Sequence, residues 1–315
     1  MEQKVGGWAV WVWFLVGGGG GWGGAAGVAG WYQWALHYKH LAWIAAKHHA
    51  LVPPNWLEAW LGTGQHAYAH RLEWWVPFAE QVRQAVEALP LEEKTLFLTG
   101  DHSWAGVILP RLARRVGKLG VLWIDAHIDL HNPATSPSGN LHGMPLALAT
   151  GLNTHRYHPL PQATWDLWQA QVEPVLSPAD LLFVGVRSYE PPEMELVQAH
   201  GIACFTAQDL HQQGIEAALQ AARALAQRCD ALYVSFDVDV WDPSFAKGAT
   251  SPAVGGLSIA HTRAFLAEVL LWPQTRFVEV TEINPLLDQT NQTGLYAYGT
   301  IRPFIDGEVG AVGLE

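Results

Sequence analysis

The sequence predicts an α/β fold in which a mostly parallel β-sheet is covered by helices on both sides. Short apolar runs rich in β-branched and aromatic residues recur along the chain from residue 95 onward. Helix-like stretches separate several of these runs, so strands and helices alternate. The runs are apolar on both faces, which is typical of parallel strands buried between two layers of helices.

An uncharged stretch at residues 6–36 precedes this alternation, and its length would suit a membrane span or a signal peptide. Nine glycines between positions 17 and 30 make it poor helix material. We therefore expect a buried first strand over residues 8–16, a Gly-rich loop after it, and no membrane partner. The glycine run lacks the Lys-Ser/Thr ending of a phosphate-binding loop.

The elements after this loop follow in a regular order. Residues 56–89 have apolar residues at roughly helical spacing. Strands are expected at residues 95–98, 121–124, 181–186, 231–236 and 277–280, and helices at residues 214–227 and 259–271. No Pro/Gly/Ser-rich linker or block of charge divides the middle of the chain, so we expect a single domain over residues 1–315.

The charge and the cysteine content narrow the class of protein. The net charge is −11 and only 15% of the residues are charged, which argues against a nucleic-acid-binding surface and favours a cationic partner, either a metal ion or a basic small molecule. The two cysteines, Cys204 and Cys229, form neither a disulfide framework nor a metal-binding spacing. We expect both to be reduced and buried in a cytoplasmic protein.

Acidic residues and histidines follow four of the predicted strands. They are Asp101 and His102 after residues 95–98, Asp125, His127 and Asp129 after 121–124, Asp237 and Asp239 after 231–236, and Glu282 after 277–280. Ligands bind at the carboxyl edge of an open parallel sheet, so these side chains should lie close together. A single Asp-x-Asp at a strand end is more often a helix cap or a turn, but three clusters at three strand ends favour a shared site.

A pair of divalent cations would neutralise this site. Asp125, His127 and Asp129 occupy alternate positions, as do Asp237 and Asp239, so in an extended chain each group points one way. The four carboxylates would repel one another without a counter-charge, and two divalent ions balance them. Oxygen and imidazole ligands without a thiolate suit Mn²⁺ better than a structural zinc.

The motifs that carry these residues resemble those of the ureohydrolase family, which includes arginase and agmatinase. The chain contains GDHS, DAHID and SFDVDVWDP, which resemble the three metal-binding signatures of the family, and VTEINP, which resembles its acidic strand end. The resemblance covers about residues 95–290. It implies a three-layer α/β/α sandwich with a mostly parallel sheet and two Mn²⁺ ions per subunit, in a homo-oligomer that is usually a trimer or a hexamer.

The resemblance also implies how the ligands are shared between the two ions. One ion would be held by His102, Asp125, Asp129 and Asp237, and the other by Asp125, His127, Asp237 and Asp239. Asp125 and Asp237 would then bridge the two ions, which agrees with the balance of charge.

The loop NPATSPSGNLHGMP resembles the arginase branch, in which the corresponding loop holds the α-carboxylate of an amino acid. Ser138 and Asn140 would make that contact. The branch usually has Asn two residues after the last Asp of its signature. This chain has His131 there and Asn132 one place later, and either could contact the substrate.

Other residues have a substrate role by the same resemblance. The stretch VGVRSYEPPE resembles the loop whose acid contacts the substrate α-amino group, which would make Glu190 that acid where the family commonly has Asp. Glu193 is a second candidate. Ser251 falls where the branch has a small hydroxyl residue near the site. Thr99 stands where the family usually has Gly, which we expect to perturb the turn more than the chemistry.

The implied reaction is hydrolysis of a small guanidino substrate, L-arginine, to urea and L-ornithine. Asp129 would orient the attacking hydroxide, His142 would exchange protons with solvent, and Glu282 would bind the guanidinium. Glu279 should point to the other face, because it lies an odd number of residues before Glu282. Agmatine, guanidinobutyrate and formiminoglutamate are alternative substrates. A non-catalytic binding or storage protein is the alternative of a different class.

Overall fold

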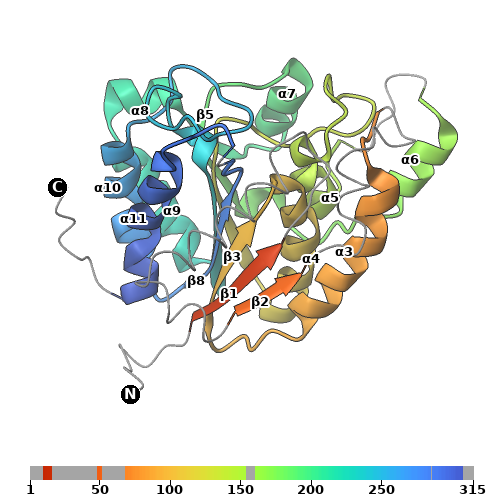
Figure 1. Ribbon diagram of the computed structural model, residues 1–315, viewed down its shortest axis with the longest axis horizontal. Coiled ribbons are helices and arrows are strands. Elements are labelled where there is room, and N and C mark those ends of the chain that lie inside the picture. Colours follow the sequence, from red (N-terminus) through yellow and green to blue (C-terminus); the bar gives the residue numbers. More distant parts are fainter. Residues whose placement is uncertain (1–9, 16–47, 52–67, 154–159, 285, 308–315) are drawn as a thin grey trace.

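The computed structural model describes residues 10–15, 48–51, 68–153, 160–284 and 286–307 of the chain (Figure 1). The strands are β1 (Val10–Leu15), β2 (His48–Leu51), β3 (Lys94–Thr99), β4 (Leu119–Ile124), β5 (Leu181–Val186), β6 (Ala203–Thr206), β7 (Ala231–Asp237) and β8 (Thr275–Thr281). The α-helices are α3 (Leu72–Glu87), α4 (Ala105–Val116), α5 (Pro145–Thr150), α6 (Gln162–Gln169), α7 (Pro191–Ala199), α8 (Ala207–Gln213), α9 (Glu216–Gln227), α10 (Ile259–Val269) and α11 (Gln292–Asp306).

These strands form one sheet in the order β2-β1-β3-β8-β7-β4-β5-β6, and each neighbouring pair is parallel. The predicted α/β class and the parallel sheet are therefore confirmed. The strands β3, β8, β7 and β4 are consecutive in this order although the chain visits them far apart. They are the four strands whose carboxyl ends carry the predicted acidic residues and histidines, so the topology brings these ends together.

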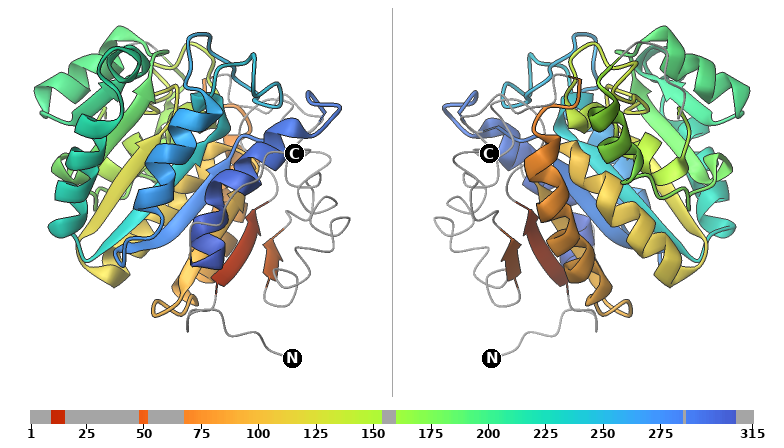
Figure 2. Two further views of the ribbon diagram at one scale, coloured as in Figure 1. Left: turned by 90° about the vertical axis from the view of Figure 1, so that its left-hand side faces the viewer. Right: turned by 90° about the vertical axis from the view of Figure 1, so that its right-hand side faces the viewer.

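Helices cover both faces of the sheet, which gives the three layers of an α/β/α sandwich (Figures 1 and 2). The helices α8 to α11 lie on one face, and α3 to α6 lie on the other. Successive residues of β4 reach opposite layers, because Leu122 and Ile124 pack in the core beneath the first set of helices and Trp123 packs in the core beneath the second. The strand is apolar throughout because both of its faces are buried.

The elements predicted from residue 95 onward agree with the structure to within about two residues. Of the helical pattern expected over residues 56–89, α3 covers Leu72–Glu87, and residues 56–67 lie outside the described residues. The helix expected from residue 214 begins at Glu216, because Gly214 has a φ of 79°. Of the expected first strand, Val10–Leu15 is described, and the Gly-rich loop lies outside the described residues. The strands β2 and β6 and the remaining helices were not predicted. Within the described segments, every helix falls short of the length and apolar character that a bilayer crossing requires.

The two cysteines differ in burial. Cys229 is buried, as expected, but Cys204 is only half-buried on β6, which is the edge strand of the sheet. Burial raises the pKa of Cys204 to about 12, so its thiol is protonated at neutral pH.

Candidate metal centre and substrate pocket

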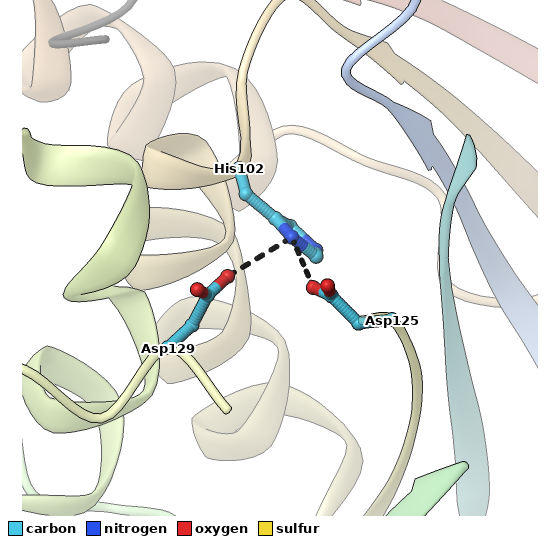
Figure 3. A group of neighbouring side chains, drawn as sticks. All are labelled: His102, Asp125 and Asp129. Carbon is cyan, nitrogen blue, oxygen red and sulfur yellow. Dashed lines mark ion pairs between the residues drawn. The ribbon is translucent and has the colours of Figure 1, made fainter. Parts of the chain in front are cut away.

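The first group of metal-ligand candidates surrounds His102, directly after β3 (Figure 3). Its Nδ1 atom lies 3.0 Å from Asp125 Oδ2, 3.2 Å from Asp129 Oδ2 and 3.3 Å from Asp237 Oδ2. All four side chains are buried. Residues at or just after the carboxyl ends of β3, β4 and β7 therefore meet at one point, as the positions of the acidic residues predict.

A second group shares Asp125 with the first. His127 Nδ1 lies 3.0 Å from Asp239 Oδ2 and 3.3 Å from Asp125 Oδ1. Asp125 thus contacts one histidine through each of its carboxylate oxygens, which is the arrangement of a bridging ligand. Asp237 contacts the first group through Oδ2, while its Oδ1 accepts a hydrogen bond of 2.7 Å from the Asp239 backbone N–H.

The donor atoms of these two groups fit divalent cations. His102 Nδ1 and Asp125 Oδ2 are buried and lack a hydrogen-bond partner of ordinary geometry, although three carboxylate oxygens lie within 3.3 Å of the nitrogen. Atoms that surround a common point without bonding to one another suit a central ion. His102 with Asp125 and Asp129, and Asp125 with His127 and Asp239, could each hold a metal ion through oxygen and imidazole nitrogen.

The carboxylates at this site repel one another when no cation is bound. Burial and the charge of Asp125 raise the pKa of Asp129 to about 7. Burial, followed by the charges of Asp239 and Asp125, raises the pKa of Asp237 well above its usual value. The chain therefore holds negative charges in a buried place where a counter-ion stabilises them.

The backbone explains why these side chains converge. Strand β4 ends at Ile124, and Asp129 has a φ of 56° in the left-handed region, so residues 125–129 are not an extended strand. The alternation expected for Asp125, His127 and Asp129 is therefore wrong in detail, although the three side chains do gather. Glu282 also has a positive φ, of 63°. Left-handed backbone at residues other than glycine is strained and is concentrated at functional sites.

A layer of polar side chains beneath the site orients His102. The Nε2 atom of His102 lies 2.6 Å from Ser235 Oγ and 3.6 Å from Glu279 Oε2. Ser235 and Thr99 each donate a hydrogen bond of 2.8 Å to Glu279. When Nε2 carries the proton, Nδ1 keeps its lone pair for a metal ion. The ring also stacks on Trp123, with ring centroids 3.9 Å apart.

Two expectations about this layer require correction. Glu279 does not point away from the site, because its carboxylate approaches the ring of His102 from below. The expected alternation of side chains does not extend to Glu282, because β8 ends at Thr281 and Glu282 has a positive φ. The direction of the Glu282 side chain therefore cannot be counted from that of Glu279. Thr99 is the last residue of β3, and its hydroxyl bonds to Glu279 rather than perturbing a turn.

Glu282 and His142 lie at the same end of the site. Glu282 Oε1 accepts a hydrogen bond of 3.0 Å from the His102 backbone N–H, and its Oε2 is buried without a hydrogen-bond partner. Burial raises the pKa of Glu282 well above its usual value. His142 Nδ1 lies 3.7 Å from Glu282 Oε1 and is also without a hydrogen-bond partner, while 18% of the His142 side chain is exposed.

A pocket of about 240 Å³ opens above these residues. Its lining consists of His102, His127, Asp129, His131, Ser136, Pro137, Ser138, Asn140, His142, Gly143, Ser188, Glu190, Glu193, Asp237, Asp239, Ser251 and Glu282. The metal-ligand candidates thus share one pocket with nearly all of the predicted substrate residues. Asp125 is fully buried.

Asn132 is the predicted substrate residue that does not line the pocket. Its side chain is fully buried, where Nδ2 donates to the Asn153 backbone carbonyl and Oδ1 accepts from the backbone N–H groups of Ala134 and Thr135. Through these hydrogen bonds the Asn132 side chain stabilises the conformation of its own loop. Of the two alternatives, His131 is therefore the residue that faces the pocket.

The lining of the pocket includes hydroxyl groups from one segment and carboxylates from another. Ser136 and Ser138 lie with Asn140 in one loop, whereas Glu190 and Glu193 belong to the start of α7. Sequence reasoning missed Ser136 and Ser188 in the lining. Ser136 lies within the loop NPATSPSGNLHGMP, which was predicted from the sequence to bind substrate, so its position in that loop could have identified it.

Comparison with known proteins gives a consistent result. The model of the Arginase family matches residues 49–305. The chain is 33% identical to the arginase of Bacillus subtilis over 218 residues, which cover 68% of this chain and 70% of that protein. It is 36% identical to the arginase of Bacillus caldovelox over 206 residues, which cover 64% of this chain and 65% of that protein.

Solved structures extend the match to nearly the whole chain. A crystal structure of Bacillus subtilis arginase superposes with a TM-score of 0.80 at 25% identity, covering 95% of this chain and 99% of that one. The Entamoeba histolytica arginase in complex with L-ornithine gives a TM-score of 0.79 at 24% identity, covering 96% and 99%. The formimidoylglutamase of Bacillus subtilis is more distant, with a TM-score of 0.69 at 18% identity and coverage of 95% and 86%.

Proposed function

This chain belongs to the arginase family of metal-dependent amidino hydrolases, and we propose that it hydrolyses the guanidino group of L-arginine to urea and L-ornithine. The observation that carries the proposal is a single pocket in which two metal-binding groups share Asp125 and in which Glu282 and His142 keep unbonded polar atoms. Such a pocket has both the charge to hold cations and free atoms to hold a substrate.

The metal site would hold two Mn²⁺ ions per chain. His102, Asp125, Asp129 and Asp237 would bind one, and Asp125, His127, Asp237 and Asp239 the other, with Asp125 and Asp237 shared. The side-chain contacts support the first set and, of the second, Asp125, His127 and Asp239. Manganese is preferred because every candidate ligand atom is a carboxylate oxygen or an imidazole nitrogen. When bound, the ions supply Lewis acidity that makes hydroxide available near neutral pH.

Glu282 would bind and orient the guanidinium. Its Oε2 atom is buried and has no hydrogen-bond partner, so an N–H of the substrate would satisfy it and offset its unfavourable burial. The pairing of a carboxylate with a planar guanidinium also fixes direction, which positions the guanidinium carbon for attack. Asp129 has a second carboxylate oxygen that can accept a hydrogen bond from the attacking group and pass a proton to the departing amine.

His142 would transfer protons between the pocket and solvent. Its Nδ1 atom is unbonded inside the pocket, and the side chain is partly exposed, so the ring can reach both environments. Burial lowers the pKa of His142, which favours a neutral ring that can accept a proton.

The outer part of the pocket would hold the amino-acid end of the substrate. The hydroxyls and amide of Ser138 and Asn140 suit a carboxylate, and Ser251 lines the same region. Glu190 and Glu193, the two acids considered for the α-ammonium group, line the same pocket, and His131 Nε2 contacts both of them. A substrate without a carboxylate, such as agmatine, would leave the hydroxyl groups unpaired.

The test combines metal analysis with urea release. Purified protein loaded with Mn²⁺ should contain two ions per chain and release urea from L-arginine, and removal of the metal should abolish the activity. Agmatine, guanidinobutyrate and formiminoglutamate, assayed in parallel by release of their urea or formamide product, test the alternative of another guanidino or formimino substrate. Higher kcat/KM with one of these than with L-arginine would overturn the assignment of arginine.

The quaternary and cellular context is part of the same proposal. We infer a single domain over residues 1–315, a homo-oligomer that is a trimer or a hexamer, and a cytoplasmic location, in line with the family and the two unpaired cysteines. Sedimentation velocity on the metal-loaded protein would test the oligomer, since a monomer at micromolar concentration contradicts it.

A further inference from the structure

The ring of His131 contacts the carboxylates of Glu190 and Glu193 in the pocket. Its Nε2 atom lies 2.7 Å from Glu190 Oε2 and 3.1 Å from Glu193 Oε2. On the other side of the ring, Nδ1 lies 3.2 Å from Thr135 Oγ1. Both ring nitrogens therefore have partners, and the ring, only 6% exposed, is held in place.

Both carboxylate oxygens of Glu193 already accept backbone hydrogen bonds. Its Oε1 accepts a hydrogen bond of 3.0 Å from the Leu130 backbone N–H, and its Oε2 accepts one of 3.1 Å from the Glu190 backbone N–H. The side chain is 3% exposed. Glu193 therefore ties the start of α7 to the metal loop, and Glu190, whose side chain is 45% exposed, is the remaining acid that a ligand can reach.

The loop with Ser136 and Ser138 lines the same pocket and supplies hydroxyl groups. Ser138 Oγ accepts the Asn140 backbone N–H at 3.2 Å, and Ser136 Oγ accepts the Gly139 backbone N–H at 2.9 Å. The two hydroxyl oxygens lie 3.4 Å apart, so one hydroxyl can donate to the other and the second hydroxyl hydrogen is left to donate to a ligand. These hydroxyl groups suit a carboxylate of the ligand. The Glu190 carboxylate, in contrast, is already paired with the ring of His131.

We propose that His131 determines substrate specificity by binding Glu190, so that the pocket recognises the carboxylate of a guanidino substrate and gains little from an α-ammonium group. Glu190 Oε2 is already paired with His131, so an ammonium that bridges both oxygens of Glu190 competes with this hydrogen bond, which reduces the gain. The chain would then hydrolyse ω-guanidino carboxylates with and without the α-amino group at comparable kcat/KM. This inference rests on the proposed hydrolase function.

The same three side chains could instead hold a further cation. Two observations favour the hydrogen-bonded arrangement. The distance of 2.7 Å between His131 and Glu190 is that of a direct hydrogen bond, and both Glu193 oxygens are engaged by backbone donors. A third Mn²⁺ per chain that is lost in His131→Asn would overturn the proposal.

The experiment compares L-arginine with 5-guanidinopentanoate, which has the same chain and carboxylate but no amino group. Wild-type protein loaded with Mn²⁺ should prefer arginine by no more than about tenfold in kcat/KM, and His131→Asn should raise this preference by about tenfold or more through KM. His211→Asn, an exposed histidine on α8, is the control and should leave the ratio unchanged. A ratio that changes less than about twofold in His131→Asn contradicts the proposal.

Glu190→Gln supplies an independent arm. In the wild-type background it should change the arginine preference by less than about threefold, but in the His131→Asn background it should abolish the gain. Calorimetry with L-ornithine and 5-aminopentanoate repeats the comparison by binding alone, and equal responses of the two ligands to His131→Asn would overturn the proposal. If no guanidino compound yields urea, the hydrolase function fails, whereas a failed His131 effect with intact urea release refutes only the inference.

Discussion

At the scale of single residues, buried polar atoms without a hydrogen-bond partner indicate where this protein binds its ligands. Buried donors and acceptors without a partner cost about 1–3 kcal/mol each, so folded proteins seldom keep several in one place. Here His102 Nδ1, Asp125 Oδ2, His142 Nδ1 and Glu282 Oε2 lie in or beneath the same pocket. Cations and a guanidinium would supply the missing partners, so this cost is relieved only when the site is filled.

His142 provides the test of proton transfer. We expect His142→Asn to lower kcat for urea release by about 100-fold, because the variant lacks the proton-transfer group. The change in KM should be smaller, because His142 Nδ1 lies 3.7 Å from Glu282 Oε1, too far for a hydrogen bond. Added imidazole should restore part of the rate. Metal content should remain at the wild-type value, since His142 is not a proposed ligand. Full activity in the variant would refute the proton-transfer role.

Residue identities could be predicted from the sequence where a motif fixed them, and side-chain directions could not. The acids and histidines at the strand ends were found because their spacing repeats at three strands. Glu279 was misjudged relative to Glu282 because the strand ends at Thr281 and Glu282 has a positive φ, and Asn132 was misjudged because its side chain bonds within its own loop. Asn132 folds its own loop and Glu279 supports His102, so both are polar for structural reasons.

At the scale of elements, the order of strands assembles the site. The chain forms β3, β4, β7 and β8 in sequence order, but the sheet places them as β3-β8-β7-β4. Ends that are separated by more than a hundred residues therefore become neighbours. The sequence indicated these four strands because each is a continuous apolar run. The prediction omitted β6, a four-residue edge strand whose residues are partly exposed.

The loop after β7 carries Ser251 to the pocket and is closed by Asp242. The Asp242 carboxylate accepts hydrogen bonds from Ser244 N at 3.0 Å and Ser244 Oγ at 2.6 Å, and from the backbone N–H groups of Gly255 at 2.7 Å and Gly256 at 3.2 Å. Chiefly the bonds from Ser244 lower the pKa of Asp242 to about 2. One ionised side chain thus joins both ends of a loop that lines the substrate pocket.

Asp242→Asn should loosen this loop in a pH-dependent way. The folded pKa lies below the ordinary value of 3.8, so the ionised Asp242 stabilises the fold above about pH 4 and this contribution is lost as the pH falls towards 2. We expect the variant to have a lower Tm than wild type at neutral pH and the difference to shrink in acid. Thermal melts across this range check it, with Asp166→Asn on the exposed face of α6 as the control. A difference that is constant with pH would contradict the role of the charge.

At the scale of the whole molecule, two apolar cores support a charged edge. One core lies between the sheet and α8 to α11, and the other lies between the sheet and α3 to α7. The carboxylates of Asp125, Asp129, Asp237 and Asp239 sit at the end of this framework and are almost fully buried. Burial and mutual repulsion make the metal-free fold less stable than its cores alone would allow. Cations that bind only the folded state should stabilise it by a free energy that grows with the logarithm of their concentration above Kd.

Asp237→Asn separates these two effects, because the substitution removes a buried charge and a proposed bridging ligand together. In metal-free protein we expect a Tm above that of wild type by a few degrees, as the charges of Asp239 and Asp125 no longer oppose a third carboxylate. In Mn²⁺ the order should reverse, because the variant binds the ions more weakly. Glu282→Gln is the matched control: it removes a buried carboxylate from the same pocket without removing a proposed ligand, so the rise in Tm on adding Mn²⁺ should persist. If Mn²⁺ raises the Tm of Asp237→Asn as much as that of wild type, Asp237 does not bind the ions, and the bridging assignment fails.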